Sequence, residues 1–164
     1  MQLRAFRGDI TALRVDVIVN AANAALRGGG GVDGAIHRAA GPELLAACLE
    51  LGGCEPGDAK ATPAFRLAAR HVVHTVGPIW QGGGAGEADV LASCYRRCIE
   101  VASGLDARTI AFPAISTSVY GYPRAEAAAI AVGTLRSAPS GLDRCDLVAF
   151  DDETLDLYEA ALSG

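Results

Sequence analysis

Residues 15–37 decide the fold, and they read VDVIVNAANAALRGGGGVDGAIH. The apolar run Val15–Val19 is typical of a buried strand, and the alanine-rich end of the segment is typical of a helix start. Between them lie two asparagines, four consecutive glycines and Asp33. A glycine loop between a strand and a helix N-terminus can present bare N–H groups to a phosphate. The glycines alone are equally consistent with a flexible surface turn.

The length and the net charge of the chain limit the classes of protein to which it can belong. The chain has 164 residues, of which 51% are apolar and 5% are aromatic. This is the usual size of one domain, and we expect residues 1–164 to form a single one. The net charge of -5 argues against a protein that coats a nucleic-acid backbone. It still permits a small anionic ligand that backbone amides hold.

The cysteine count predicts the redox state. Five cysteines form an odd number without C-x-x-C spacing, so we expect neither a disulfide framework nor a metal site. The residues are Cys48, Cys54, Cys94, Cys98 and Cys145. We expect reduced, mostly buried cysteines in a cytoplasmic protein. Met1–Arg4 lacks the start of a signal peptide, and no apolar run is long enough to span a membrane.

Strand-like and helix-like segments alternate along the chain. We predict strands at 2–7, 15–19, 59–65, 71–76, 109–112 and 147–150. We predict helices at 33–40, 42–51, 87–103, 123–135 and 152–162, and a short helical turn that Thr11 caps. This order predicts an α/β protein, a three-layer α/β/α sandwich with a central mixed sheet. In such sheets a ligand binds beyond the carboxyl ends of the strands.

Five stretches are more specific together than any one of them is alone. They are Gly8–Thr11, Val17–Asn23, Gly28–His37, His74–Pro78 and Phe112–Pro123. In this order and spacing they closely resemble the macrodomain family, specifically the MacroD-like ADP-ribosylhydrolases. The resemblance extends from Asp9 to about Tyr158. Its most specific part is Asn-Ala-Ala-Asn followed by Gly-Gly-Gly-Val-Asp.

The resemblance implies a macrodomain-like fold with a cleft for ADP-ribose. It implies an enzyme that removes mono-ADP-ribose from acidic side chains, where the linkage is an ester, and that deacetylates O-acetyl-ADP-ribose. No cofactor and no metal are implied. The expected partners are ADP-ribose, its esters and mono-ADP-ribosylated proteins, without a membrane. Nucleic acid is expected only as an ADP-ribosylated substrate.

The resemblance also implies which residues contact the ligand. Asp9, beside Ile10, would accept a hydrogen bond from the adenine amino group, and Phe150 would lie against the adenine face. The loops 29–32 and 116–121 would enclose the diphosphate with backbone N–H groups. The whole set is Asp9, Ile10, Asn23, Gly29, Gly30, Gly31, Val32, Asp33, Ser116, Thr117, Ser118, Val119, Tyr120 and Phe150. Without the resemblance, a turn-stabilising aspartate is the better interpretation of Asp9, and a core phenylalanine explains Phe150 equally well.

Asn23 and Asp33 are the predicted catalytic residues. The Asn23 amide both donates and accepts hydrogen bonds, which suits a ribose hydroxyl. Asp33 lies where a helix begins, and the N–H groups there favour its ionised form. Together with the ligand's α-phosphate it would orient a water that attacks the distal ribose or an acyl carbonyl. A plain helix cap is the alternative for Asp33.

Several polar side chains near these motifs have structural interpretations. We expect Asn20 to brace the glycine loop, and His71 and His74 to be histidines with satisfied hydrogen bonds. His37 lies one helical turn after Asp33, so it would brace that carboxylate or the loop.

Ser118 departs from the family pattern, which has glycine in Ser-Thr-Gly-Val-Tyr-Gly. If this position needs a positive φ, a serine is strained or crowds a phosphate, unless its hydroxyl adds a contact. In the same loop Tyr120 would form an aromatic wall over the distal ribose, and Tyr122 would pack in the core.

Three other functions remain as alternatives. The first is a reader that binds ADP-ribose without cleaving it, against which Asn23 and Asp33 argue. The second is a hydrolase of ADP-ribose phosphate or of ADP-ribose attached to nucleic acid, and the negative charge weakens the latter. A dinucleotide-dependent dehydrogenase is more distant, because no G-x-G-x-x-G opens a helix.

Overall fold

The structure is a computed structural model that describes every residue from Met1 to Gly164. Its six strands are β1 (Gln2–Arg7), β2 (Val17–Ala21), β3 (Ala59–Pro63), β4 (His71–Thr75), β5 (Thr109–Phe112) and β6 (Arg144–Ala149). Its helices are α1 (Gly31–Ala40), α2 (Pro42–Leu51), α3 (Glu87–Gly104), α4 (Arg124–Ser137) and α5 (Asp152–Ser163), with a short 3-10 turn η1 (Ile10–Ala12).

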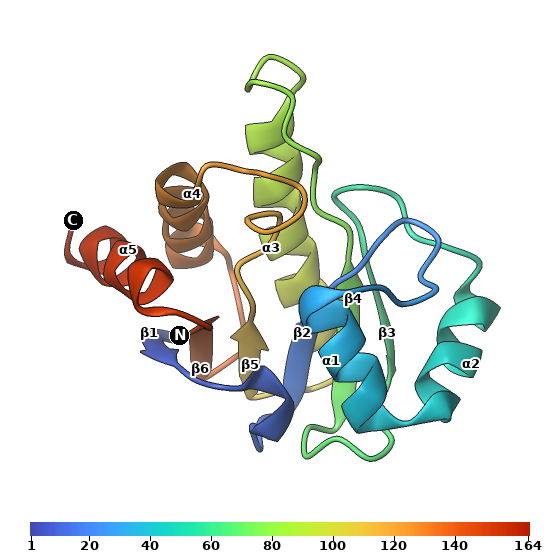
Figure 1. The fold of residues 1–164 in the computed structure, drawn as a ribbon. Coiled ribbons are helices and arrows are strands. Elements are labelled where there is room, and N and C mark those ends of the chain that lie inside the picture. Colours follow the sequence, from blue (N-terminus) through green and yellow to red (C-terminus); the bar gives the residue numbers. More distant parts are fainter.

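The strands form one mixed sheet in the order β1-β6-β5-β2-β4-β3. Only the β3–β4 pair is antiparallel, and every other neighbouring pair is parallel. Helices α1 and α2 cover one face of the sheet, and α3, α4 and α5 cover the other (Figure 1). The prediction of a three-layer α/β/α sandwich with a mixed sheet is therefore confirmed.

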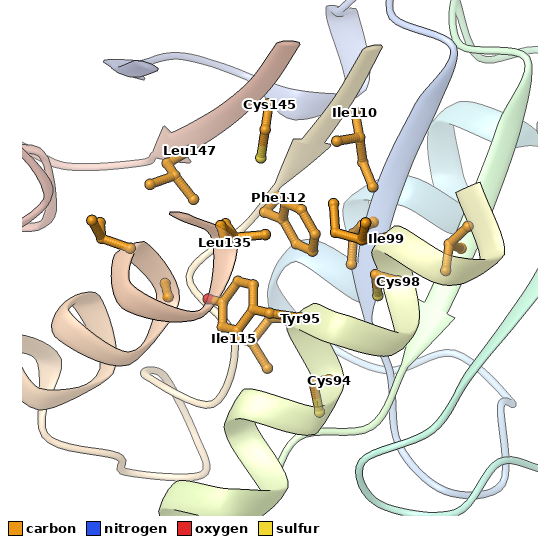
Figure 2. Close-up of a cluster of buried hydrophobic side chains, with 14 of the residues drawn as sticks. Cys94, Tyr95, Cys98, Ile99, Ile110, Phe112, Ile115, Leu135, Cys145 and Leu147 are labelled. Atoms are coloured by element: carbon orange, nitrogen blue, oxygen red, sulfur yellow. The ribbon is translucent and has the colours of Figure 1, made fainter. Parts of the chain in front are cut away.

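Alternating side chains of the buried strands fill both cores. Val17 and Val19 of β2 face the core beneath α3–α5, whereas Ile18 between them faces the core beneath α1 and α2. In the larger core Tyr95 of α3 packs against Phe112 of β5, with ring centroids 5.0 Å apart (Figure 2). This burial on both faces explains why these strands are continuous apolar runs in the sequence.

Element boundaries differ from the predictions where a polar side chain has a specific partner. The strand predicted to begin at Leu147 begins at Arg144, because Asp146 is buried within β6 as an ion pair. Its Oδ1 lies 2.6 Å from Nε of Arg4 and 3.2 Å from Nε of Arg144. The prediction that Thr11 caps the first helical turn is wrong. Asp9 is the cap of η1, since its side chain accepts a hydrogen bond from the Thr11 N–H.

Both edge strands of the sheet carry basic side chains. At one edge, β1 carries Arg4 and Arg7 and pairs only with β6. At the other edge, β3 has five residues and ends at Pro63. Lys60 of β3 donates hydrogen bonds to the carbonyl oxygens of Leu51 and Gly53, which ties this edge to the end of α2.

The cysteines are all free and buried, as expected. Burial raises the pKa of Cys48 and of Cys54 to about 11, so both remain thiols at neutral pH. No helix combines the length and the apolar character that a membrane crossing requires.

Parallel pairing gathers the informative loops. The carboxyl ends of β1, β6, β5, β2 and β4 lie at the same edge of the sheet, because these strands run in one direction. The segments after Arg7, Ala21, Thr75, Phe112 and Ala149 therefore meet at that edge.

Candidate active site

A cleft at this edge consists of two hollows, with volumes of about 330 and 420 Å³. The first, here called the Asp33 hollow, is lined by Ala21, Ala22, Asn23, Gly29, Gly30, Gly31, Val32, Asp33, Gly77, Ala114, Ser116, Ser118, Val119 and Tyr120. The second, the Phe150 hollow, is lined by Gly8, Asp9, Ile10, Thr11, Gly31, Val32, Ala35, Pro113, Ala114, Thr117, Ser118, Val148 and Phe150. They share Gly31, Val32, Ala114 and Ser118, so they form one continuous cleft.

The structure brings all fourteen predicted ligand-contacting residues to this cleft. The lining residues that sequence reasoning missed are mostly small. They are Gly8, Thr11, Ala21, Ala22, Ala35, Gly77, Pro113, Ala114 and Val148. Small residues contribute backbone or a few methyl groups, so their type alone signals no site. Eight of the nine lie within the five stretches that carry the family resemblance, which is the signal that could have found them, and only Val148 lies outside.

A third hollow of about 370 Å³ lies away from the cleft, between β1, α4 and α5. Five of its six lining residues are apolar, and the sixth is Arg136. The Arg136 guanidinium donates hydrogen bonds to carbonyl oxygens at the end of α5. This hollow offers no reactive side chain, so the chemistry belongs to the cleft.

The first glycine loop leads into the uncapped start of α1. Gly30 is the N-cap residue, and no side chain satisfies the N–H groups of the first turn. Gly28 and Gly31 adopt φ angles of 83° and 59°, which only glycine adopts easily. Position 34 also requires glycine, because a Cβ there would lie 2.5 Å from the carbonyl oxygen of Gly29. The helix start therefore presents free N–H groups and positive potential to the cleft.

Asp33 is held at the floor of the cleft by buried groups. It is the third residue of α1 and only 5% exposed. Its Oδ1 accepts a 2.8 Å hydrogen bond from Nδ2 of Asn20, and no side chain or backbone group donates to its Oδ2. Oδ2 lies 3.3 Å from the position that a Cβ on Gly29 would occupy, so it points toward the glycine loop. A plain helix cap is excluded, because Gly30 occupies the cap position.

His37 contacts both groups that it was expected to brace. Its Nε2 lies 3.4 Å from Oδ1 of Asp33, one helical turn away. The same ring lies against Gly28, where an added Cβ would be 3.6 Å from Cδ2. His37 therefore fixes the carboxylate relative to the loop.

Asn20 and Asn23 order the region around Asp33 and the first glycine loop through hydrogen bonds. Nδ2 of Asn23 donates a 2.9 Å hydrogen bond to the carbonyl oxygen of Gly28, while its Oδ1 is buried and has no partner. Asn20 is fully buried and contacts Asp33 and His74, so it braces the carboxylate rather than the glycine loop that it was expected to brace. His74 is also buried, and it contacts Thr62. The His71 side chain, at the start of β4, is half-buried and has no hydrogen-bond partner within the chain.

The second loop forms the opposite wall of the cleft. Its left-handed residue is Ser116, with φ 66°, and Ser118 is not in that region. The strain that a serine at position 118 would suffer in a positive-φ conformation is therefore absent. The backbone N–H of Trp80 donates a 2.8 Å hydrogen bond to the carbonyl oxygen of Tyr120, which anchors the loop. Tyr122 is 3% exposed and packs in the core as expected.

The Phe150 hollow is open and aromatic on one side. Phe150 is 67% exposed, so it is not a core residue. The guanidinium carbon of Arg124 lies 6.0 Å from the ring centroid, and Arg124 is itself paired with Asp151 at 3.1 Å. Across the hollow, Oδ1 of Asp9 caps η1, while its Oδ2 accepts no intramolecular hydrogen bond. The cleft thus offers a free carboxylate oxygen at each end, with amide-lined loops between them.

Comparisons with known proteins agree with this geometry. The family model described as "Macro domain" matches residues 19–131. A macro domain-containing protein of Ralstonia nicotianae is 60% identical over 161 residues, covering 98% of this chain and 94% of the relative. A Salmonella newport protein named O-acetyl-ADP-ribose deacetylase is 53% identical, covering 99% of this chain and 94% of the relative.

A solved structure extends the likeness to three dimensions. A mutant macrodomain of Oceanobacillus iheyensis with ADPR superimposes with a TM-score of 0.94 at 42% identity. The match covers 98% of this chain and 91% of that one. The match to the family model and the identity to full-length relatives settle the assignment. This chain belongs to the macro domain family.

Proposed function

We propose that this protein is a hydrolase that binds ADP-ribose and cleaves its esters. Its substrates would be O-acetyl-ADP-ribose and mono-ADP-ribose linked to acidic side chains. The relative from Salmonella newport is named for the first activity, and the Oceanobacillus macrodomain holds ADPR. The observation that carries the proposal is the buried Asp33, which keeps one carboxylate oxygen free in an amide-lined cleft.

One elongated ligand would occupy both hollows. The adenine would lie against the exposed face of Phe150, with its amino group donating to the free Oδ2 of Asp9. The diphosphate would lie between the start of α1 and the loop around Ser118, where the hollows join. The distal ribose would then reach the Asp33 hollow, beside Tyr120. Backbone N–H groups suffice to hold the phosphates, which is consistent with a net charge of -5.

Asp33 would act by orienting water. Its Oδ2 would accept a hydrogen bond from a water molecule, and the ligand's α-phosphate would accept the second. In deacetylation the water oxygen bonds to the acetyl carbonyl carbon, and the ester bond to the ribose oxygen breaks. Acetate leaves, one proton of the water forms the ribose hydroxyl, and the other proton passes to solvent. In a protein whose Asp or Glu side chain is esterified to ADP-ribose, the water would attack either the acyl carbonyl or the distal ribose. Either route would give ADP-ribose and a free carboxylic acid.

The test is release of ADP-ribose from a protein that is mono-ADP-ribosylated on glutamate or aspartate. Wild type should release it, and Asp33→Ala should not, while calorimetry shows that both still bind ADP-ribose. Glu43→Ala, which removes an exposed acidic side chain in the first turn of α2, is the matched control. Binding without release by wild type would support the reader instead. Full release by Asp33→Ala would refute the role of Asp33.

A further inference from the structure

A chain of buried polar groups leads from the floor of the cleft into the sheet. Nδ2 of Asn20 is 2.8 Å from Oδ1 of Asp33 and 3.1 Å from Nδ1 of His74. Nε2 of His74 is 3.0 Å from Oγ1 of Thr62. All four residues are at most 5% exposed. Water therefore cannot replace these contacts, and each group depends on its neighbour.

Asp33 determines the orientation of the Asn20 amide. An ionised carboxylate only accepts hydrogen bonds, so the amide must turn an N–H toward Oδ1. The flipped amide would place its oxygen 2.8 Å from the carboxylate oxygen, and two acceptors repel each other. The second N–H of the same amide then points to His74.

The Asn20 amide in turn determines the tautomer of His74. Because Asn20 donates, Nδ1 of His74 must be unprotonated, and its proton lies on Nε2. From Nε2 the proton is donated to Oγ1 of Thr62, 3.0 Å away, with Sγ of Cys48 at 3.6 Å. Burial holds the pKa of His74 near 4, so the ring is neutral at pH 7.

We propose that His74 is a positioning residue for the hydrolysis proposed above. By accepting the second N–H, Nδ1 of His74 holds the Asn20 amide in place, so that its first N–H stays on Oδ1 of Asp33. Oδ2 then stays in the cleft, where it orients the water. This inference rests on the proposed function, but the hydrogen-bond chain that it describes can be measured without turnover.

Two variants each replace one of the two ring nitrogens of His74 with a polar side-chain atom. The side-chain oxygen of His74→Asn can replace the Nδ1 acceptor, whereas the amide of His74→Gln reaches only the Nε2 position and Thr62. We expect His74→Gln to lower kcat by roughly tenfold to a hundredfold, because a small misplacement of a catalytic group has such an effect. His74→Asn should recover most of this loss. KM and the affinity for ADP-ribose should change by less than about threefold in both variants, because His74 does not line the cleft.

The difference in kcat between His74→Gln and His74→Asn distinguishes a positioning role of His74 from a general effect on folding. If kcat follows the thermal stability of the variants, or if His74→Gln retains the wild-type kcat, the proposal is wrong. NMR of the wild-type imidazole nitrogens gives a second test that needs no variant to fold. We expect the proton on Nε2, and a proton on Nδ1 would overturn the chain of contacts. Wild type that shows the expected tautomer but releases no product would refute the proposed function alone.

Discussion

The hydroxyl of Ser116 occupies the space that a side chain at Gly77 would need. A Cβ on Gly77 would overlap Oγ of Ser116 and lie 2.7 Å from Cγ2 of Ile115. Ser116 is only 8% exposed and is held in a left-handed conformation. The turn after β4 therefore packs directly against the loop 116–121. Because Gly77 and Ser116 both line the Asp33 hollow, the shape of that hollow depends on this contact.

Gly77→Ala should damage the cleft and the fold together. The added methyl group must displace Ser116, so we expect a loss of about 1–3 kcal/mol in the free energy of unfolding. The affinity for ADP-ribose should fall as the second loop moves. Urea denaturation and calorimetry measure the two effects. Unchanged values in both would show that the loops accommodate the methyl group.

Gly133→Ala is the matched control and should stabilise the protein. Gly133 is exposed in the interior of α4, has no positive φ, and a Cβ there would meet nothing within 4 Å. Alanine restricts the unfolded chain more than glycine, so the free energy of unfolding should rise by about 0.5–1 kcal/mol. A higher urea midpoint with unchanged ADP-ribose affinity is the expected result, and a lower midpoint would contradict it.

Acid should destabilise the protein through His74. A histidine in the unfolded chain has a pKa of about 6.5, whereas burial lowers the pKa of His74 to about 4 and nearby His37 adds to the shift. As the pH falls from about 6.5 to 4, the unfolded chain binds the proton first, so folding stability falls. The loss approaches about 3 kcal/mol. Urea titrations at pH 7 and 4.5 should show a smaller loss for His74→Gln, and equal losses would exclude His74 as the cause.

Glu87 organises the glycine-rich loop before α3. Its carboxylate accepts hydrogen bonds from the N–H groups of Gln81, Gly83 and Ala85 at 2.7–3.0 Å. These bonds lower the pKa of Glu87 to about 2, so its contribution to stability is present at neutral pH and disappears only as the pH falls toward 2.

Glu87→Gln should therefore lower the Tm and speed proteolysis within residues 81–86. The NH2 group of the glutamine side chain cannot accept the hydrogen bonds that one carboxylate oxygen of Glu87 accepts from the loop. Asp89→Asn, an exposed acidic residue of the same helix turn, should leave both unchanged. Equal effects of the two substitutions would mean that net charge, rather than the loop contacts, sets the result.

Phe150→Ala should weaken ligand binding without affecting folding. The ring is 67% exposed, so little core packing is lost. If adenine stacks on it, the Kd for ADP-ribose should rise about tenfold, as expected for one aromatic–base contact. Ile79→Ala, which removes another exposed apolar side chain (57%), serves as the control in the same calorimetric titration. An unchanged Kd would place the base elsewhere.

The sequence was most informative where local chemistry alone decides the structure. Helix α2 has the predicted bounds Pro42–Leu51, because Pro42 opens it and the left-handed Gly52 closes it. The glycine loop and Asp33 were assigned to one site because they adjoin in the chain. Such signals need no tertiary partner.

The features that sequence reasoning missed depend on partners far along the chain. Asp146 is accommodated inside a strand only because Arg4, 142 residues away, pairs with it. The left-handed residue of the second loop is Ser116 rather than Ser118, and the contact with Gly77 accompanies it. The contact of Asn20 with His74 likewise joins neighbouring strands that are 54 residues apart.

The edges of the sheet have a consequence for behaviour at high concentration. β3 is five residues long and ends at Pro63, which has no N–H to offer to another strand. β1 exposes Arg4 and Arg7, which pair with Asp146 and Asp152, so charged rather than apolar side chains stand along this edge. Neither edge is a long, flat, apolar template. Sheets from different molecules therefore lack a long apolar edge on which to join, and we expect the folded protein to resist fibril-like aggregation at high concentration.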